Sequence, residues 1–462
     1  MSEENSSGFR RWLVPAGVFC AVLALQLWLV AAAGTDVPYY DQWVIEGSWL
    51  YPKWCEGSLH AADLLTASNE HRIVWSHLLN LTLFSLNGQW DPLVQLVAVA
   101  GIRAASAAAI VALAGVGLAS RARWLIAAAV TVAFLPHLAW HCVLWGIESF
   151  VLVLAMLALW LLGTGAPTTR RTLAGLAAGG AALVAMGPGA LVPAVLLGWA
   201  IFRAIDARRL DAAVWRATWP ALMLLAAAVA LRVSVPGHAG LEPVSGAQLF
   251  AAFLRMASWP HGLPVAAVLM NLPLLLLAGG RLLHYRRPAE GEDFVLLAAG
   301  WSVGIALATA WARGGGDELA VGVPSRYVDF LVFLPLANLW CVAVLATGAA
   351  ARWRASSRLL AAAWAVFLFA GWLGLSAQVI RGIILPRAHD REAPVRLTRA
   401  FQLTRDPAVF AGQPRLLVPH PHPEVMLAVM DDPRLQGRLP PSLQPEKPLG
   451  PLSRAVRWLL GR

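Results

Sequence analysis

The polar stretch that follows the first long apolar segment carries residue types that a chemical reaction needs. Asp36 and Asp41 come directly after the apolar residues 12–33, and Trp43 follows two positions later. A carboxylate at the boundary between water and an apolar phase loses part of its hydration. This loss raises its pKa and suits it to act as a general base. The alternative is an ordinary turn or cap carboxylate in a solvated loop, and the two acids alone favour that alternative.

A second polar group in the same stretch, Asn69-Glu70-His71-Arg72, stands just before another apolar run. Asn69 is suited to cap the helix that such a run predicts. Glu70 is suited to act as a second acid or base or to hold a metal ion, and Arg72 to bind a phosphate through two parallel hydrogen bonds. A charged helix start with a local Glu–Arg pair explains the same residues equally well, so both interpretations stay open.

Two later turns carry further polar residues. His141, Trp145 and Glu148 surround one turn, and Arg326 with Tyr327 stands in the other. Arg326 is a candidate phosphate ligand, and its alternative is an interfacial arginine whose charged end reaches water. Glu148 opens an apolar helix, where a carboxylate also interacts favourably with the helix dipole.

The composition shows what must surround these groups. Hydrophobic residues make up 58% of the 462 residues and charged residues 13%, whereas a soluble globular chain has about 25% charged residues. The apolar residues form blocks of roughly 18 or more without a charge, long enough to cross a hydrocarbon layer of about 30 Å. We therefore predict an all-α polytopic membrane protein and exclude a soluble enzyme, a disulfide-rich secreted domain and a disordered chain. Arg103 lies inside one apolar block and is a functional candidate because a charge there is costly.

The net charge of +10 is spread over short loops, which membrane topology explains better than nucleic-acid binding. About eleven transmembrane helices are expected. The arginine-rich loops fall on one side of this arrangement, so that side and the N-terminus are predicted to be cytoplasmic. Gly187-Pro188-Gly189 divides residues 172–202 into two short helices. The expected spans are 12–33, 93–119, 124–140, 149–163, 172–186, 190–202, 219–234, 264–280, 294–311, 328–348 and 359–378.

This topology puts two long segments on the outer face. Residues 1–378 form a transmembrane domain whose long first external loop, 34–91, is the candidate catalytic loop. Helical apolar spacing at 59–65 and 73–84 predicts two amphipathic surface helices within that loop. Residues 379–462 are rich in proline and arginine and contain no segment that could span, so they are predicted to be an extracytoplasmic C-terminal tail.

A first helix, a long external loop that opens with an aspartate, and many further spans resemble the GT-C superfamily of membrane glycosyltransferases. The chain is most similar to bacterial membrane proteins of GT-C type whose reaction is not assigned. Four motifs carry this resemblance, and Glu148 stands where a glutamine is expected. They are Asp41-Gln-Trp43, Asn69-Glu70-His71-Arg72, Trp145-Gly-Ile-Glu148 and Pro324-Ser-Arg326-Tyr327.

The resemblance implies transfer of a sugar from a polyprenyl-phosphate donor to an envelope glycan, lipid or protein acceptor, at the outer face of a bacterial cytoplasmic membrane. Asp41 would be the base and Glu70 a second carboxylate, and both would hold a divalent cation, Mg²⁺ or Mn²⁺, if the site uses one. The implied substrate-binding residues are Asp36, Trp43, His71, Arg72, Trp145, Glu148, Arg326 and Tyr327.

Two other functions compete with this one. A non-catalytic lipid or glycan carrier, such as a flippase component, would need polar residues along a path through the membrane, and Arg103 and Arg232 are almost the only candidates. A structural envelope protein would tolerate replacement of Asp41 and Glu70.

Overall fold

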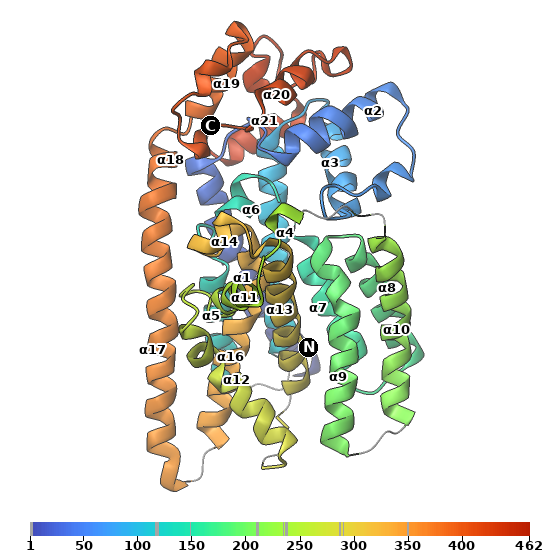
Figure 1. The fold of residues 1–462 in the computed structure, drawn as a ribbon, viewed down its shortest axis with the longest axis vertical. Coiled ribbons are helices and arrows are strands. Elements are labelled where there is room, and N and C mark those ends of the chain that lie inside the picture. The colour runs from blue at the N-terminus through green and yellow to red at the C-terminus, as the bar shows by residue number, and fades with distance from the viewer. Residues whose placement is uncertain are drawn as a thin grey trace.

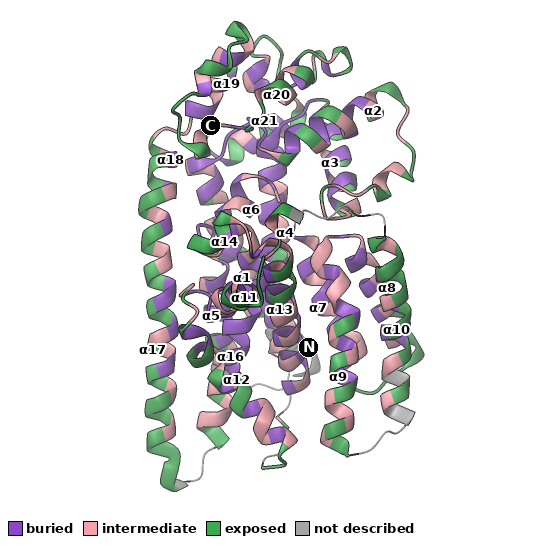
Figure 2. Cartoon of the chain, viewed as in Figure 1, coloured by how far each residue is buried: buried purple, intermediate pink, exposed green. Residues whose placement is uncertain are grey.

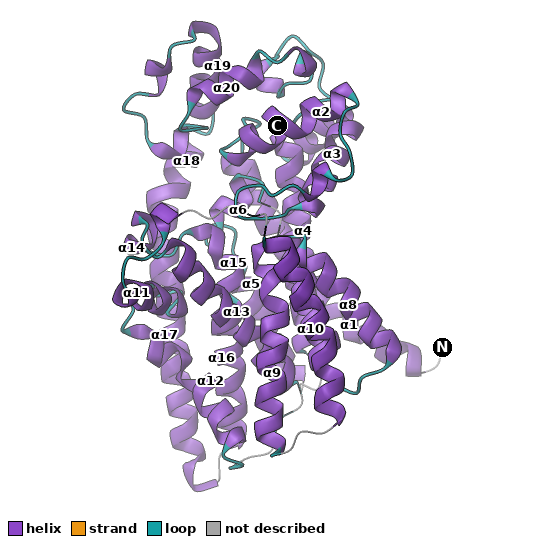
Figure 3. Ribbon diagram, turned by 45° about the vertical axis from the view of Figure 1, so that its right-hand side comes forward, coloured by secondary structure: helices purple, strands orange, loops and turns teal. Residues whose placement is uncertain are grey.

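The computed structural model describes residues 3–115, 120–147, 149–208, 212–233, 235, 239–285, 288–289, 291–348 and 351–462. Throughout these ranges the chain forms helices joined by loops, and no strand occurs in them (Figure 3). The elements divide into an elongated helical bundle and, at one end of it, a layer of short helices (Figure 1). We call this end layer the outer layer.

Each apolar segment expected from the sequence overlaps a helix of the bundle, although the segment expected at 124–140 is helical only to Ala133 and again at Trp140. Six helical stretches are long and apolar enough to cross a membrane, namely Trp12–Ala33, Pro92–Ala114, Gly187–Ala207, Glu292–Arg313, Ser325–Gly348 and Arg354–His389. The bundle helices are α1 (Glu3–Ala33), α4 (Pro92–Ala114), α5 (Ser120–Ala133), α7 (Phe150–Gly163), α8 (Thr169–Leu183), α9 (Val192–Ala207), α10 (Ala212–Arg232), α12 (Ala266–Leu282), α13 (Glu292–Arg313), α15 (Val328–Leu331), α16 (Phe333–Gly348) and α17 (Arg354–Val379).

The outward face of the bundle is apolar. On α17, which lies at one edge of the bundle, Leu359 and Leu373 are 72% and 71% exposed (Figure 2). Large apolar side chains exposed in such numbers would be unfavourable in water and are expected against lipid. The chain is therefore a helical membrane protein.

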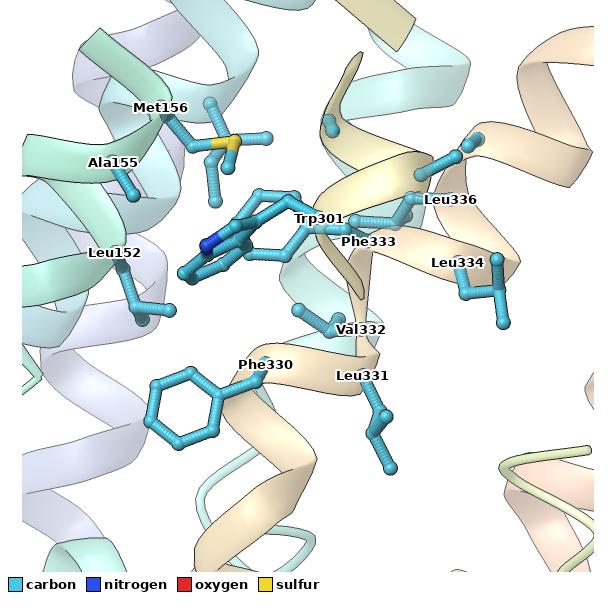
Figure 4. Packing of buried hydrophobic residues seen from close by; sticks show 14 of the residues in the cluster. Leu152, Ala155, Met156, Trp301, Phe330, Leu331, Val332, Phe333, Leu334 and Leu336 are labelled. Atoms are coloured by element: carbon cyan, nitrogen blue, oxygen red, sulfur yellow. The ribbon is translucent and has the colours of Figure 1, made fainter. Parts of the chain in front are cut away.

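The interior of the bundle is packed with large side chains. Trp301 of α13 is fully buried and lies between Leu152 and Met156 of α7 and Phe330 of α15 (Figure 4). Its indole N–H donates to the carbonyl of Pro188, 3.0 Å away. This bond satisfies the one polar group of the ring and ties α13 to the Gly-Pro-Gly segment.

Arg103 of α4 forms a buried ion pair with Asp329 of α15. Ser149 donates a second hydrogen bond to the same carboxylate at 3.2 Å. A buried charge is costly unless it is paired, so this pair accounts for an arginine inside an apolar segment by holding two bundle helices together.

Residues 172–202 form two helices, as predicted. α8 ends at Leu183, a short 3₁₀ turn covers Gly187–Leu191, and α9 follows. A Cβ atom on Gly189 would lie 1.9 Å from the carbonyl oxygen of Ala182. Only glycine permits this close approach of two backbone segments.

The outer layer combines the first external loop with the C-terminal segment. From the loop come the π-helix Gln42–Leu50 (η1), α2 (Tyr51–Glu56) and α3 (Val74–Asn87). The C-terminal segment adds α18 (Leu385–His389), α19 (Ala393–Thr404), α20 (Pro423–Met430) and α21 (Pro451–Leu459). Both contribute to one hydrophobic core, which contains Trp43, Tyr51, Phe84, Trp90, Phe401, Phe410, Met426 and Val429.

Other short helices are α6 (Trp140–Leu144), α11 (Gly246–Ala257) and α14 (Asp317–Val321). α6 lies just below the outer layer in Figure 1, whereas α11 lies at the level of the bundle helices and packs against α12 and α13. The helix expected at 73–84 corresponds to α3. The prediction of a helix at 59–65 was wrong, because only Asp63–Leu65 is helical there and it forms a 3₁₀ turn. Asp63 there accepts from Lys53 and from the backbone N–H of His60.

Candidate functional site

A cavity of about 1490 Å³ lies where the outer layer meets the bundle. Its lower wall is apolar and comes from the bundle, including Leu183, Leu231, Ile305 and Leu375. Its upper wall is polar. Seven residues predicted from the sequence line it together, namely Asp41, Glu70, His71, Arg72, Trp145, Arg326 and Tyr327. Glu148 lies outside the described residues.

Asp41 lies at the first turn of η1, and its side chain is exposed to the cavity. No described side chain or backbone group hydrogen-bonds its carboxylate. The carboxylate is nevertheless close enough to His71 to stabilise the charged form of that ring. Asp41 is thus a carboxylate exposed in the cavity, with no hydrogen-bond partner among the described residues.

The Asn-Glu-His-Arg motif forms a tight turn, not a helix start. The backbone of Ser68 exchanges two hydrogen bonds with that of His71, at 2.7 and 3.0 Å. Asn69 adopts a positive φ of 52°, which asparagine tolerates better than most residues. α3 begins only at Val74, so the prediction that Asn69 caps this helix was wrong. The turn directs Glu70 towards the end of α13, where its carboxylate lies 3.0 Å from Arg313.

His71 is buried against the Gly-Pro-Gly segment. A Cβ atom on Gly187 would lie 2.7 Å from Nδ1 of its ring, so this contact requires glycine. Burial lowers the pKa of His71, which keeps the ring neutral at pH 7. Its Nδ1 is buried without a hydrogen-bond partner among the described residues.

Three guanidinium groups gather beside this turn, and we call Arg72, Arg232 and Arg313 the inner arginine group. Arg72 donates to the carbonyl of Leu231 at 3.1 Å, and Arg232 to the carbonyl of Glu70 at 3.4 Å. The Nε atom of Arg313 is buried without a hydrogen-bond partner in the described part of the chain. α10 and α13 position two of these arginines at their C-terminal ends, where a cation is favoured.

Arg326 and Arg415 form a second group, which we call the outer arginine group. They share the carboxylate of Glu318, which is paired with Arg326 and lies 3.5 Å from Arg415. Arg415 also donates to the hydroxyl of Tyr40 at 3.0 Å. It comes from the C-terminal segment, for which the sequence predicts no role at the site.

An aromatic surface adjoins the outer arginine group. Trp145 stacks on Tyr40 at 4.6 Å between ring centres, and on its other neighbour Tyr39 at 6.0 Å. His141 lies 4.2 Å from Trp145 and hydrogen-bonds Ser325. Burial, together with Arg326 and Arg415, lowers the pKa of His141 to about 3, so this ring is neutral.

Asp36 and Trp43 do not line the cavity. Asp36 is buried, lies 3.0 Å from Arg457 of α21, and accepts from the backbone N–H of Ser442 at 2.9 Å. Trp43 is fully buried and donates to the carbonyl of Pro38 at 2.7 Å. Both residues support the outer layer and the start of η1, which carries Asp41.

Glu46, one turn of η1 after Asp41, lines the cavity and was not among the predicted site residues. Its carboxylate accepts from Asn80, Gln95 and Tyr51 at 3.1, 2.6 and 3.1 Å. These donors come from α3, α4 and α2, so the network fixes η1 against three other helices. The presence of Glu46 in the first loop was the only signal for it in the sequence.

The described residues offer limited means to hold a metal ion. No three histidine, cysteine, aspartate or glutamate side chains among them are grouped for coordination. Of the two predicted ligands, Glu70 already pairs with Arg313. The arrangement is one unpaired carboxylate between two groups of arginines, above an apolar wall. No known family model matches this chain, and a search of curated proteins finds no relative.

Proposed function

We propose that the protein is an integral-membrane glycosyltransferase that takes a sugar from a polyprenyl-phosphate donor. The observation that carries this proposal is that Asp41, without a hydrogen-bond partner among the described residues, and the arginines lie in one cavity above apolar bundle residues. An amphiphilic donor needs such a site, because its phosphate requires cationic hydrogen-bond donors and its chain an apolar wall. The acceptor would be an envelope glycan, lipid or protein.

In the proposed reaction, Asp41 accepts the proton of an acceptor hydroxyl as its oxygen attacks the anomeric carbon of the donor sugar. The bond between that carbon and the phosphate oxygen breaks, and polyprenyl phosphate leaves with the electron pair. Attack from the face opposite the phosphate inverts the anomeric configuration. The arginines stabilise the negative charge on the departing phosphate.

The proposed topology has about eleven spans, a cytoplasmic N-terminus, and the cavity facing the periplasm or cell exterior of a bacterial cell. The supporting features are the arginine-rich short loops, which alternate along the sequence with loops poor in arginine, and the position of the cavity beside the outer layer. A polyprenyl-linked donor would reach the cavity from the bilayer.

The test is mass spectrometry of envelope glycans and glycolipids from a deletion strain carrying wild-type protein, Asp41→Asn or Asp431→Asn at equal membrane levels. Asp41→Asn should lower the transfer rate about 100- to 10,000-fold, since general-base catalysis contributes that much. Asp431, an exposed acid of the outer layer paired with Arg405, is the matched control.

The expected result is that a sugar lost in the deletion strain returns with wild type and Asp431→Asn but not with Asp41→Asn. Its mass would identify the sugar. Full restoration by Asp41→Asn would contradict the transferase and favour a carrier, which needs no proton acceptor at this position.

A further inference from the structure

The positive charge of the cavity is divided between the two arginine groups. In the inner group, the carboxylate of Glu70 pairs with Arg313, while Arg72 and Arg232 donate to the backbone carbonyls of Leu231 and Glu70. In the outer group, two guanidinium groups share the carboxylate of Glu318. In each group the arginines outnumber the carboxylate that pairs with them, which leaves positive charge for a ligand to neutralise.

Asp41 lies between the two groups. On one side its charge acts on His71, which belongs to the turn that carries Glu70 and Arg72. On the other side its chain neighbour Tyr40 accepts a hydrogen bond from Arg415. A reaction at Asp41 would thus have an anion-binding group on either side.

The inner group is connected to the apolar wall. Arg232 and Arg313 end α10 and α13, and residues of the same helices, such as Leu231 and Ile305, continue the lining downwards. Two buried polar atoms here, Nε of Arg313 and Nδ1 of His71, lack a partner among the described residues. Such atoms are costly unless a ligand or water satisfies them.

The outer group has a different neighbourhood. Arg415 is 74% exposed and belongs to the outer layer, so a ligand can reach it from outside the membrane. Beside it the stacked rings of Tyr40 and Trp145 offer an aromatic surface. A sugar ring packs on such a surface, while an adjoining arginine binds an anion that the sugar carries.

Building on the proposed function, we infer that the cavity binds two anionic groups at once. The inner group holds the phosphate of the lipid donor. The outer group, with Tyr40 and Trp145, holds an acceptor sugar that itself carries a phosphate. This assigns the acceptor to the phosphate-bearing glycans and gives the C-terminal segment a role in recognising it through Arg415.

The test is calorimetric titration of the full-length protein in maltoside micelles, which contain no phosphate. Farnesyl phosphate is the probe for the inner group. A panel of hexose 1-phosphates, with the neutral hexoses beside it, is the probe for the outer group. Variants are Arg415→Gln, Arg313→Gln and, as control, Arg405→Gln, which changes an exposed arginine paired with Asp431.

We expect at least one hexose 1-phosphate to bind with equal affinity whether or not farnesyl phosphate is saturating. Arg415→Gln should lower the affinity for that hexose 1-phosphate about tenfold or more. Arg313→Gln should lower the affinity for farnesyl phosphate by a similar factor, as expected for loss of a charge-assisted hydrogen bond. Arg405→Gln should change neither.

Three results would overturn the inference and leave the proposed function standing. They are competition between the two probes, equal binding of the neutral hexoses, and no hexose 1-phosphate binding while farnesyl phosphate binds. Failure of farnesyl phosphate to bind properly folded protein would instead overturn the lipid-phosphate donor itself.

Discussion

Asp36 and Asp41 stand five positions apart in the first loop, yet their surroundings are opposite. Asp41 is exposed in the cavity, whereas Asp36 is buried between Arg457 and Asp91. The sequence predicted that both acids follow the first helix. It could not distinguish them, because Arg457 and Ser442, which contact Asp36, come from the C-terminal segment, more than 400 positions along the chain.

Because Asp36 is buried, we expect the stability of the protein to depend on pH. Burial, and after it the carboxylate of Asp91, raise the pKa of Asp36 from 3.8 to about 6, although Arg457 and Ser442 oppose the shift. The folded state thus binds a proton that the unfolded state releases between about pH 4 and 6. The contribution of Asp36 to the free energy of unfolding is fully present below pH 4. It falls by about 3 kcal/mol as the pH rises to 6.

Thermal melts of the purified protein between pH 4 and 7 would measure this effect. Asp36→Asn cannot titrate, so its melting temperature should lack the decline that Asp36 contributes. Identical pH profiles for wild type and Asp36→Asn would show that the carboxylate is not held in a raised-pKa environment.

A second prediction at the residue scale concerns metal ions. Because Arg313 lies 3.0 Å from Glu70, this carboxylate already has a cationic partner. We expect sugar transfer to persist in excess EDTA. If activity disappears with EDTA and returns with Mg²⁺ or Mn²⁺, Asp41 and Glu70 hold a cation, and the Arg313 contact must open.

At the scale of elements, the Gly-Pro-Gly segment positions the turn that carries the motif. Gly187 touches the ring of His71, and a Cβ atom would come within 2.7 Å of it. Gly187→Ala must therefore displace His71 and with it the neighbouring Glu70. We expect transfer activity to fall at least about tenfold, with a loss of stability of about 1–3 kcal/mol from overpacking.

Gly180→Ala is the matched control, because nothing lies within 4 Å of its Cβ position on α8. Activity and melting temperature of both variants would be measured side by side. A Gly187→Ala protein as active as Gly180→Ala would mean that the position of His71 does not matter for the reaction.

The elements differ in how far the sequence predicts them. Apolar length predicted the bundle helices, and Gly187-Pro188-Gly189 predicted the break between α8 and α9. Neither η1 nor the amphipathic α11 was expected. η1 depends on distant partners, since Gly47 fits closely against Val429 and Glu46 bonds to Gln95. Local patterns contain no information on such contacts.

The same limit applies to the candidate site. Motifs in the first loop, beside α6 and before α15 identified seven of the residues that line the cavity, because polar residues beside apolar segments are conspicuous. Arg415 and Tyr40 were missed, since a lone arginine in a proline-rich segment has no distinguishing pattern. Only the fold brings Arg415 within hydrogen-bonding distance of Tyr40.

At the scale of the whole molecule, the C-terminal segment closes the outer layer onto the first helix. Arg387 and Arg462 donate to backbone carbonyls at the end of α1, including those of Ala33 and Gly34. The carbonyl of Pro419 accepts from the backbone of Tyr40 at 2.8 Å, next to Asp41. The two ends of the chain thus position the candidate base together.

Arg457 provides the most direct test of this closure. It pairs with both Asp36 and Asp91, and its side chain is only 16% exposed. Arg457→Ala leaves two buried carboxylates without their cation, which costs about 3–5 kcal/mol. Arg454→Ala, one turn earlier on the exposed side of α21, removes the same charge without that penalty.

Limited proteolysis and thermal melts of membranes carrying each variant would separate two outcomes. If the outer layer depends on Arg457, that variant alone is cleaved within residues 379–462 and loses transfer activity, although Asp41 is unchanged. If both variants resist cleavage like wild type, the outer layer holds through its hydrophobic core of Trp43, Phe401 and Val429. In that case the ion pairs of Arg457 affect only the pH dependence of stability that Asp36 causes.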